Sequence, residues 1–187
     1  MDKRKVILVT DGDMAAKKAV EIAAANIGAR CISASAGNPT VLTGDEIIEL
    51  IKVAEHDPVV VMVDDRGVKG KGEGEEAMEK ILQDNSVQVL GIVAVSSNGK
   101  DCNGINTTCS VTKEGNIIEG AVDKYGTDIH KRGICGDTLS ILSGVKDIVI
   151  VGIGDPGKME YNDEVSKRSP ITTKALEEVL KRSGYKH

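Results

Sequence analysis

The feature that most constrains this fold is the apolar run at residues 59–63, which ends in two adjacent aspartates and a glycine-rich loop. An apolar run without alternation is typical of a strand covered on both faces, as in a parallel sheet. Asp64 and Asp65 then lie at the carboxyl end of that strand, the edge where open α/β sheets bind ligands. Spaced glycines let backbone amides approach an anion or a metal-bound ligand, so we predict ligand contacts at Gly67, Gly70, Gly72 and Gly74. The glycine spacing matches no standard phosphate-binding pattern, so it is not specific evidence for a ligand. The alternative is a flexible surface loop.

The pattern of an apolar run followed by carboxylates occurs twice more. Residues 6–10 precede Asp11-Gly12-Asp13, and residues 147–153 precede Gly154-Asp155. Amphipathic segments with helical spacing separate the apolar runs, so the first hundred residues read as β-α-β-α-β-α-β. This alternation predicts an α/β fold with a mainly parallel sheet and helices on both faces, a three-layer arrangement of Rossmann-like or Toprim-like type. We expect residues 1–187 to form a single domain.

Residues 98–135 depart from this alternation and are predicted to be an inserted β-hairpin. They are rich in Asn, Gly, Thr and charged residues, and short alternating stretches flank Lys113-Glu114-Gly115. Local signals elsewhere are sharper. Thr43 and Glu46 have the spacing of a helix capping box, Ser169 is expected to cap the last helix, and residues 31–36 are predicted to form a strand.

The strand-end carboxylates are the candidate metal ligands. With a strand order of 2-1-3-4, the first and third strands are neighbours about 4.8 Å apart, so their carboxylates can share one cation. Oxygen-only ligands favour Mg²⁺, Mn²⁺ or Ca²⁺, and the free amides of the following helix starts add a place for an anion. We predict a metal site of Asp11, Asp13, Asp64 and Asp65, with Asp155 as a further ligand-binding residue. The alternative is that Asp13 only caps a helix and the other carboxylates only occupy turns.

Composition argues against several classes of function. A net charge of −5 and the absence of Phe and Trp disfavour a nucleic-acid partner, which needs basic patches or aromatic stacking. No apolar run approaches the roughly 20 residues of a membrane span, and residues 6–9 are too short for a signal peptide, so we expect a soluble, cytoplasmic protein. Its histidines are scattered. Its cysteines form no CxxC pair and are expected to be free thiols: Cys31, Cys102, Cys109 and Cys135.

The sequence contains no recognisable catalytic motif. Serines at strand ends lack the surrounding pattern of a nucleophile elbow, and no histidine is tied to them by spacing. Strand-end carboxylates beside a glycine loop look like the Toprim arrangement of metal-dependent phosphoryl-transfer enzymes. That arrangement normally places a glutamate after the first strand, whereas this chain has Asp11. The similarity is therefore one of architecture, and the catalytic residues stay unknown.

Longer strings of residues carry a more specific resemblance. The chain resembles the stage V sporulation protein AE family, short soluble type, in VTDGD at 9–13, RCISASAGNPTVLTGDEI at 30–47, DDRGVKGKGEGE at 64–75, VGIGDPGKM at 151–159 and SPIT at 169–172. The similarity extends over most of the chain and is weakest at 98–134. It implies an endospore-forming bacterium and a role with the stage V A-group membrane proteins, which move calcium dipicolinate into the forespore and release it in germination.

Two functions follow from these observations. The favoured one is a soluble, non-enzymatic component of the stage V A-group system, located in the cytoplasm of the forespore or spore or peripheral to the spore inner membrane. Its strand-end crevice would bind a small anionic ligand or a cation, with Mg²⁺ or Ca²⁺ as the cofactor to expect. The alternative is a Toprim-like divalent-metal-dependent hydrolase or phosphotransferase. A homo-oligomer is compatible with either.

Overall fold

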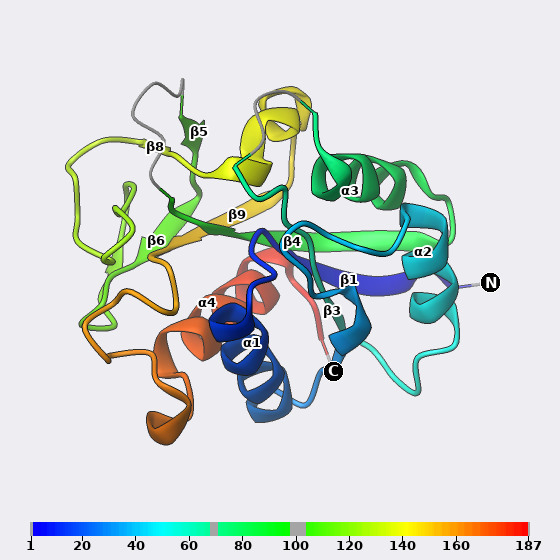
Figure 1. The fold of residues 1–187 in the computed structure, drawn as a ribbon, viewed down its shortest axis with the longest axis horizontal. Helices are drawn as coiled ribbons and strands as arrows, with labels where there is room; N and C mark the ends of the chain where they lie inside the picture. Colours follow the sequence, from blue (N-terminus) through cyan, green and yellow to red (C-terminus); the bar gives the residue numbers. More distant parts are fainter. Residues whose placement is uncertain (1, 68–70, 98–103, 187) are drawn as a thin grey trace.

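A computed structural model describes residues 2–67, 71–97 and 104–186. Its main sheet has the strand order β2-β3-β1-β4-β9-β6-β7 and is parallel except for the β6–β7 pair. Figure 1 shows this sheet crossing the middle of the molecule. The strands are β1 (Arg4–Val9), β2 (Arg30–Cys31), β3 (Val59–Met62), β4 (Val87–Val95), β6 (Cys109–Val111), β7 (Ile117–Ile118) and β9 (Val149–Ile153).

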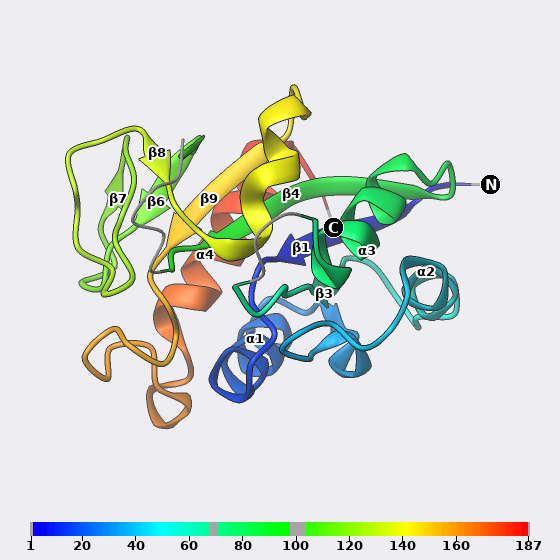
Figure 2. The ribbon, with the colours of Figure 1, turned by 45° about the horizontal axis from the view of Figure 1, so that its top comes forward.

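Helices cover both faces of the sheet, which confirms the predicted α/β class. One face carries α1 (Met14–Asn26) and α4 (Pro170–Ser183), and the other carries α2 (Gly44–Lys52), α3 (Glu73–Gln83) and the 3₁₀ segment η2 (Asp137–Gly144). Figures 1 and 2 show α1 and α4 on the opposite side of the sheet from α3 and η2. Successive side chains of a strand point to opposite faces, so β1 contributes to two cores. Val6 and Leu8 enter the core under α2 and α3, whereas Ile7 and Val9 enter the core under α1 and α4.

The strand order differs from the predicted 2-1-3-4 because β1 and β3 exchange places. The first and third strands are neighbours, as the site prediction required, but β2 lies beside β3 and β4 lies beside β1. The strand predicted at residues 31–36 is also wrong beyond its first residue, because Ser33–Ser35 form a 3₁₀ turn, η1. The buried Ser35 hydroxyl accepts a hydrogen bond from the Met62 amide at 2.9 Å, in the place of a backbone ladder partner.

The predicted hairpin appears in β6 and β7, which pair Ser110 with Ile118 and Val111 with Ile117. β6 also pairs in parallel with β9, so this hairpin extends the main sheet. A second small antiparallel pair, β5 (Ile105–Asn106) with β8 (Gly133–Ile134), lies in the same insertion. Residues 98–103 of the predicted segment lie outside the described residues.

The helix caps confirm one local prediction and correct another. Thr43 and Glu46 form the predicted capping box of α2. Ser169 occupies the N-cap position of α4, but its side chain makes no capping hydrogen bond. The buried Asp163 does this instead, because its Oδ1 accepts from the amides of Ile171 at 2.7 Å and Thr172 at 3.0 Å. The short segment η3 (Val165–Lys167) precedes this helix.

The thiol prediction holds for two of the four cysteines. Cys31 and Cys109 are free thiols. Cys135 is disulfide-bonded, so the prediction is wrong for that residue, and Cys102 lies outside the described residues. In the part of the chain that the structure describes, no helix is both long enough and apolar enough to cross a membrane.

The start of α3 packs directly on the end of β3, and Gly74 makes this contact possible. A Cβ atom at Gly74 would lie 2.6 Å from the backbone N, C and O atoms of Asp64. Backbone atoms cannot rotate away as the end of a flexible side chain can, so a methyl group here must shift the helix. The glycine therefore fixes the distance between α3 and the strand-end residues.

We predict that Gly74→Ala lowers the free energy of unfolding by about 1–3 kcal/mol, although alanine is the better helix former. Urea unfolding monitored by circular dichroism measures this change. Gly144→Ala is the matched control, because a Cβ atom at Gly144 would meet no atom within 4 Å. Equal stability of the two variants would show that the close approach is not rigid.

Candidate functional site

Four carboxylates from three strand ends form one acidic cluster. Asp11 and Asp13 follow β1, Asp64 follows β3 and Asp155 follows β9. Burial and, after it, the negative charges of Asp13, Asp64 and Asp155 together raise the pKa of Asp11 to about 8, against one backbone hydrogen bond from Asp13 that lowers it. The Asp64 Oδ2 atom accepts a hydrogen bond from the Gly12 amide at 3.3 Å, which holds this carboxylate beside the Asp11 segment. The cluster therefore contains four of the five predicted aspartates, and we call it the strand-end cluster.

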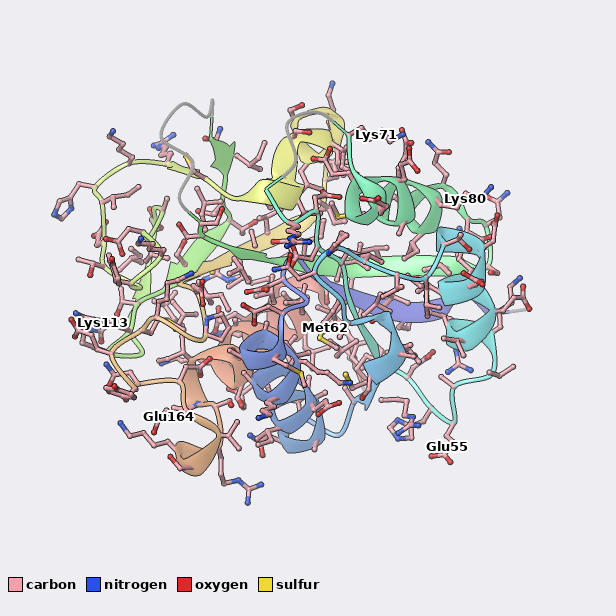
Figure 3. All side chains as sticks on the ribbon, viewed as in Figure 1. Glu55, Met62, Lys71, Lys80, Lys113 and Glu164 are labelled. Carbon is pink, nitrogen blue, oxygen red and sulfur yellow. The ribbon has the colours of Figure 1, made fainter. Side chains whose placement is uncertain are left out.

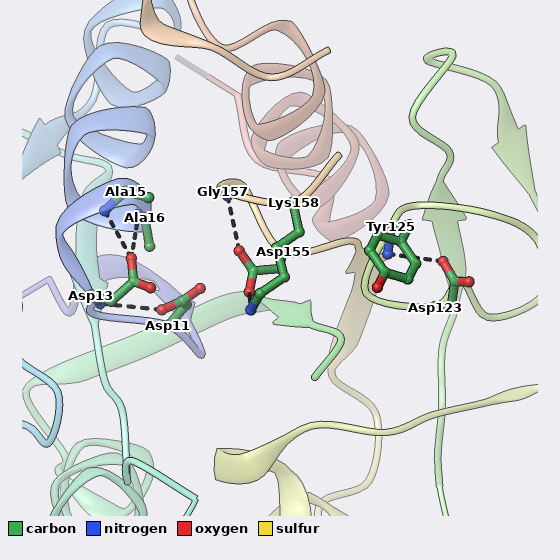
Figure 4. Close-up of polar contacts among 9 residues, drawn as sticks. All are labelled: Asp11, Asp13, Ala15, Ala16, Asp123, Tyr125, Asp155, Gly157 and Lys158. Carbon is green, nitrogen blue, oxygen red and sulfur yellow. Dashed lines mark hydrogen bonds and ion pairs between the residues drawn. The ribbon is translucent and has the colours of Figure 1, made fainter. Parts of the chain in front are cut away.

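Lys158 belongs to the strand-end cluster and was not predicted. Its ammonium pairs with Asp155, whose other carboxylate oxygen accepts from the Gly157 amide at 2.9 Å (Figure 4). The hydrogen bond to Asp155 raises the pKa of Lys158, and the charges of Asp155, Asp11 and Asp13 raise it further. The lysine follows Asp155 by three residues, a spacing typical of paired side chains in a turn of helix. That spacing was the only sequence signal for it.

Asp13 has a structural role as well as a place in the cluster. Its Oδ1 atom accepts from the amides of Ala15 at 2.8 Å and Ala16 at 2.9 Å, and so caps α1 (Figure 4). Its own amide donates to Asp11 Oδ1 at 3.2 Å. The amides of Ala15 and Ala16 in the first turn of α1 are therefore occupied, and the prediction that they are free to hold an anion is wrong for these two.

Asp65 lies away from the other predicted metal ligands. Its side chain is buried, and its Oδ1 atom accepts from the amides of Gly74 at 2.6 Å and Glu75 at 3.1 Å. Burial raises the pKa of Asp65, and these two amide hydrogen bonds oppose the increase. The adjacent Asp64 instead accepts from the amides of Gly12 and Arg66. The two aspartates at the end of β3 thus contact different neighbours, and the amides of Gly74 and Glu75 in the first turn of α3 are occupied too.

The glycines of residues 67–74 have packing roles where the structure describes them. Gly67 adopts a positive φ of 67°, which suits a tight turn. A Cβ atom at Gly72 would collide with the Asp65 carboxylate, and one at Gly74 would collide with the backbone of Asp64. Gly70 lies outside the described residues. Ligand binding by these glycines stays a prediction.

A surface groove of about 560 Å³ opens beside the strand-end cluster. It runs between the start of α1 and residues 156–166, two segments that lie side by side in Figures 1 and 2. Its wall includes Ala15 and Gly157, whose amides donate to Asp13 and Asp155 of the cluster. Its other lining residues combine exposed apolar and charged side chains, among them Met14, Lys18, Tyr161, Val165 and Glu164, which is labelled in Figure 3.

The carboxylates do not form a complete metal site on their own. Among residues 2–67, 71–97 and 104–186, no group of three or more His, Cys, Asp or Glu side chains is arranged to hold a metal ion. Asp13 is engaged with α1, and Asp155 with Lys158.

The sequence profile of the family described as Stage V sporulation protein AE1 matches residues 5–183. The chain belongs to this family. The match covers the elements that carry the strand-end cluster and confirms the resemblance drawn from the sequence. No curated protein and no solved structure gives a match. Membership assigns this stage V sporulation protein AE1 relative a role in sporulation.

The strand-end cluster is predicted to make the protein less stable as the pH rises. Asp11 keeps its proton in the folded state up to about pH 8, whereas the unfolded chain loses it near pH 3.8. The folded state therefore binds more protons between these values, so the free energy of unfolding falls as the pH rises through this range.

The Asp11→Asn variant has no ionisable side chain at position 11, so its unfolding free energy does not show this decrease with pH. We expect the advantage of the variant over the parent in unfolding free energy to grow by up to about 5 kcal/mol between pH 4 and pH 8, at about 1.4 kcal/mol per unit of pKa difference. Urea unfolding at a series of pH values measures this growth. A constant difference across that series would show that Asp11 ionises normally in the folded protein.

Proposed function

We propose that this family member is a non-enzymatic component of the stage V A-group system that moves calcium dipicolinate, and that it binds the calcium chelate at the strand-end cluster. The observation that carries the proposal is the excess of carboxylates over cations in the cluster. Asp11, Asp13, Asp64 and Asp155 lie together with Lys158 as the one ammonium described among them. A ligand with a positive centre relieves the repulsion that raises the pKa of Asp11.

A chelated calcium suits the cluster better than a bare ion. Calcium takes six to eight oxygen ligands, and a bare ion would need most of them from the protein. The strand-end cluster cannot supply them, because Asp13 is engaged with α1 and Asp155 with Lys158. Dipicolinate already binds calcium through its ring nitrogen and two carboxylates, so the chelate has only the remaining positions to fill. We assign these positions to Asp11 and Asp64, which lie side by side at the ends of β1 and β3.

The surroundings of the cluster suit the organic part of the chelate. The Lys158 side chain is 47% exposed, and its ammonium can pair with a dipicolinate carboxylate. The adjacent groove has apolar surface for an aromatic ring, because Met14 and Tyr161 line it and are 66% and 75% exposed. An acidic cluster, an ammonium and an apolar wall together match a ligand that is cationic at its centre, anionic at its edge and aromatic in between.

Phosphoryl transfer is the less favoured function. Metal-dependent phosphoryl transfer needs an enzyme whose own carboxylates hold the metal ion beside the phosphate. In the strand-end cluster, Asp13 is engaged as a helix cap and Asp155 as the partner of Lys158. We therefore propose a binding role, exercised together with the membrane proteins of the stage V A group at the spore inner membrane.

We predict that dipicolinate binds this protein only when calcium is present. Isothermal titration calorimetry with dipicolinate, in excess calcium chloride or in chelator, measures this directly. Asp11→Asn and Asp64→Asn should each weaken binding by about tenfold or more, since loss of even an indirect metal partner costs 10–100-fold. Glu177→Gln is the matched control, because it removes the same charge from an exposed position on α4. Calcium-independent binding, hydrolysis of phosphate esters, or equal binding by all variants would contradict the proposal.

Binding should also strengthen as the pH rises from 6 to 8. The pKa of Asp11 is about 8 without ligand, so at pH 7 most molecules must release a proton before Asp11 can ligate calcium. Titration at several pH values in two buffers of different ionisation enthalpy measures both the affinity and the proton release. In Asp11→Asn this pH dependence should disappear. An affinity that does not change with pH in the parent would exclude Asp11 as a ligand.

A further inference from the structure

A second group of polar side chains lies buried where β3, α3 and η2 meet. Asp65 follows β3, Glu75 belongs to the first turn of α3, and Thr138 belongs to η2. Their exposed fractions are 0%, 1% and 1%. The region lies on the α3 side of the sheet, and Asp65 joins it to the end of the strand that also carries Asp64. We call these three residues the buried cluster.

Each carboxylate of the buried cluster is satisfied through one oxygen only. Asp65 Oδ1 accepts from two amides of α3. Glu75 Oε1 accepts from the Ser140 amide at 2.8 Å, from the Ser140 hydroxyl and from the Ile141 amide at 3.4 Å, and so joins α3 to η2. The remaining atoms, Asp65 Oδ2, Glu75 Oε2 and Thr138 Oγ1, are enclosed and have no hydrogen-bond partner.

The three unpartnered atoms belong to one place. The Glu75 amide donates to Asp65, and the Glu75 side chain accepts from Ser140, two residues after Thr138, so hydrogen bonds link the three segments that carry these atoms. The Thr138 side chain also lies near enough to the Asp65 carboxyl to lower its pKa, against the increase that burial causes. Buried polar atoms without partners are uncommon in folded proteins, and an unseen water or ion is a usual explanation for them.

The buried cluster also lacks a cation among the described side chains. None of the ion pairs in the described ranges involves Asp65 or Glu75. Lys71 is the basic residue whose pKa Glu75 affects, and it lies at the outer surface, where it pairs with Glu79 (Figure 3). Two buried carboxylates held only by amides and a hydroxyl leave a large charge uncompensated.

We propose that the buried cluster binds a divalent hard cation through Asp65 Oδ2, Glu75 Oε2 and Thr138 Oγ1. Oxygen-only ligands select Ca²⁺ or Mg²⁺, and the two carboxylates balance the charge of such an ion. The ion joins the end of β3, the start of α3 and η2, so its role is structural. This site is separate from the strand-end cluster and does not depend on the function proposed above.

Thermal unfolding of the metal-stripped full chain, with and without calcium or magnesium chloride, tests the site. A ligand that binds only the folded state raises the melting temperature progressively with its concentration. We expect this increase in the parent, in Asp11→Asn and in the exposed neighbour variant Glu76→Gln. Thr138→Val should fold, because it removes a hydroxyl that has no partner, and should need at least about ten times more cation for the same increase. Glu75→Gln should respond least.

Three results would overturn the proposal. The first is a parent melting temperature that no divalent cation changes. The unpartnered atoms would then be explained by a shared proton or a water molecule between the carboxylates. The second is a Thr138→Val variant that responds as the parent does. The third is a response that Asp11→Asn abolishes and Thr138→Val retains, which would assign the cation to the strand-end cluster. Metal analysis of the untreated parent protein should find about one equivalent of a divalent cation per chain.

Discussion

The interaction on which this structure depends is an aspartate carboxylate that accepts the first amides of a helix. Asp13 does this for α1, Asp65 for α3 and Asp163 for α4. The amide end of a helix carries partial positive charge and unpaired donors, so a carboxylate satisfies both needs at once. Asp65 and Asp163 reach their helices from eight to ten residues earlier in the chain, so each also fixes a loop against the helix it caps.

The capping role of Asp65 explains how two adjacent aspartates, Asp64 and Asp65, belong to two different sites. Successive residues of an extended strand point to opposite sides, so Asp64 accepts from Gly12 beside β1 while Asp65 turns to α3. The arrangement needs a helix start that can approach the strand end closely. Gly72 and Gly74 provide this, since a side chain at either position would collide with Asp65 or Asp64. The glycine loop is therefore explained in part by packing, independently of any ligand.

The sequence was most informative where local rules decide the structure. Continuous apolar runs gave the central strands, and the Thr43–Glu46 spacing gave the α2 cap, because strand burial and capping boxes depend on near neighbours. Contacts between distant residues were not predictable in this way. The Ser35 hydroxyl replaces a strand partner for Met62, Asp163 caps a helix that Ser169 precedes, and Lys158 neutralises Asp155. Each depends on side chains that meet only after the sheet has formed.

The two acidic clusters differ in access to solvent, and this difference assigns them different roles. The strand-end cluster borders a groove and contains a half-exposed ammonium, so a ligand there can enter and leave. The buried cluster is enclosed, so an ion there must be acquired on folding or during local opening. Adjacent residues of one strand end carry the two sites. Gly74 packs the first turn of α3 against the backbone of Asp64, and Asp65 accepts from the amides of the same turn, so both aspartates contact α3. Glu75 in turn connects the start of α3 to Ser140 of η2, so one chain of direct contacts links the strand-end cluster, the buried cluster and η2.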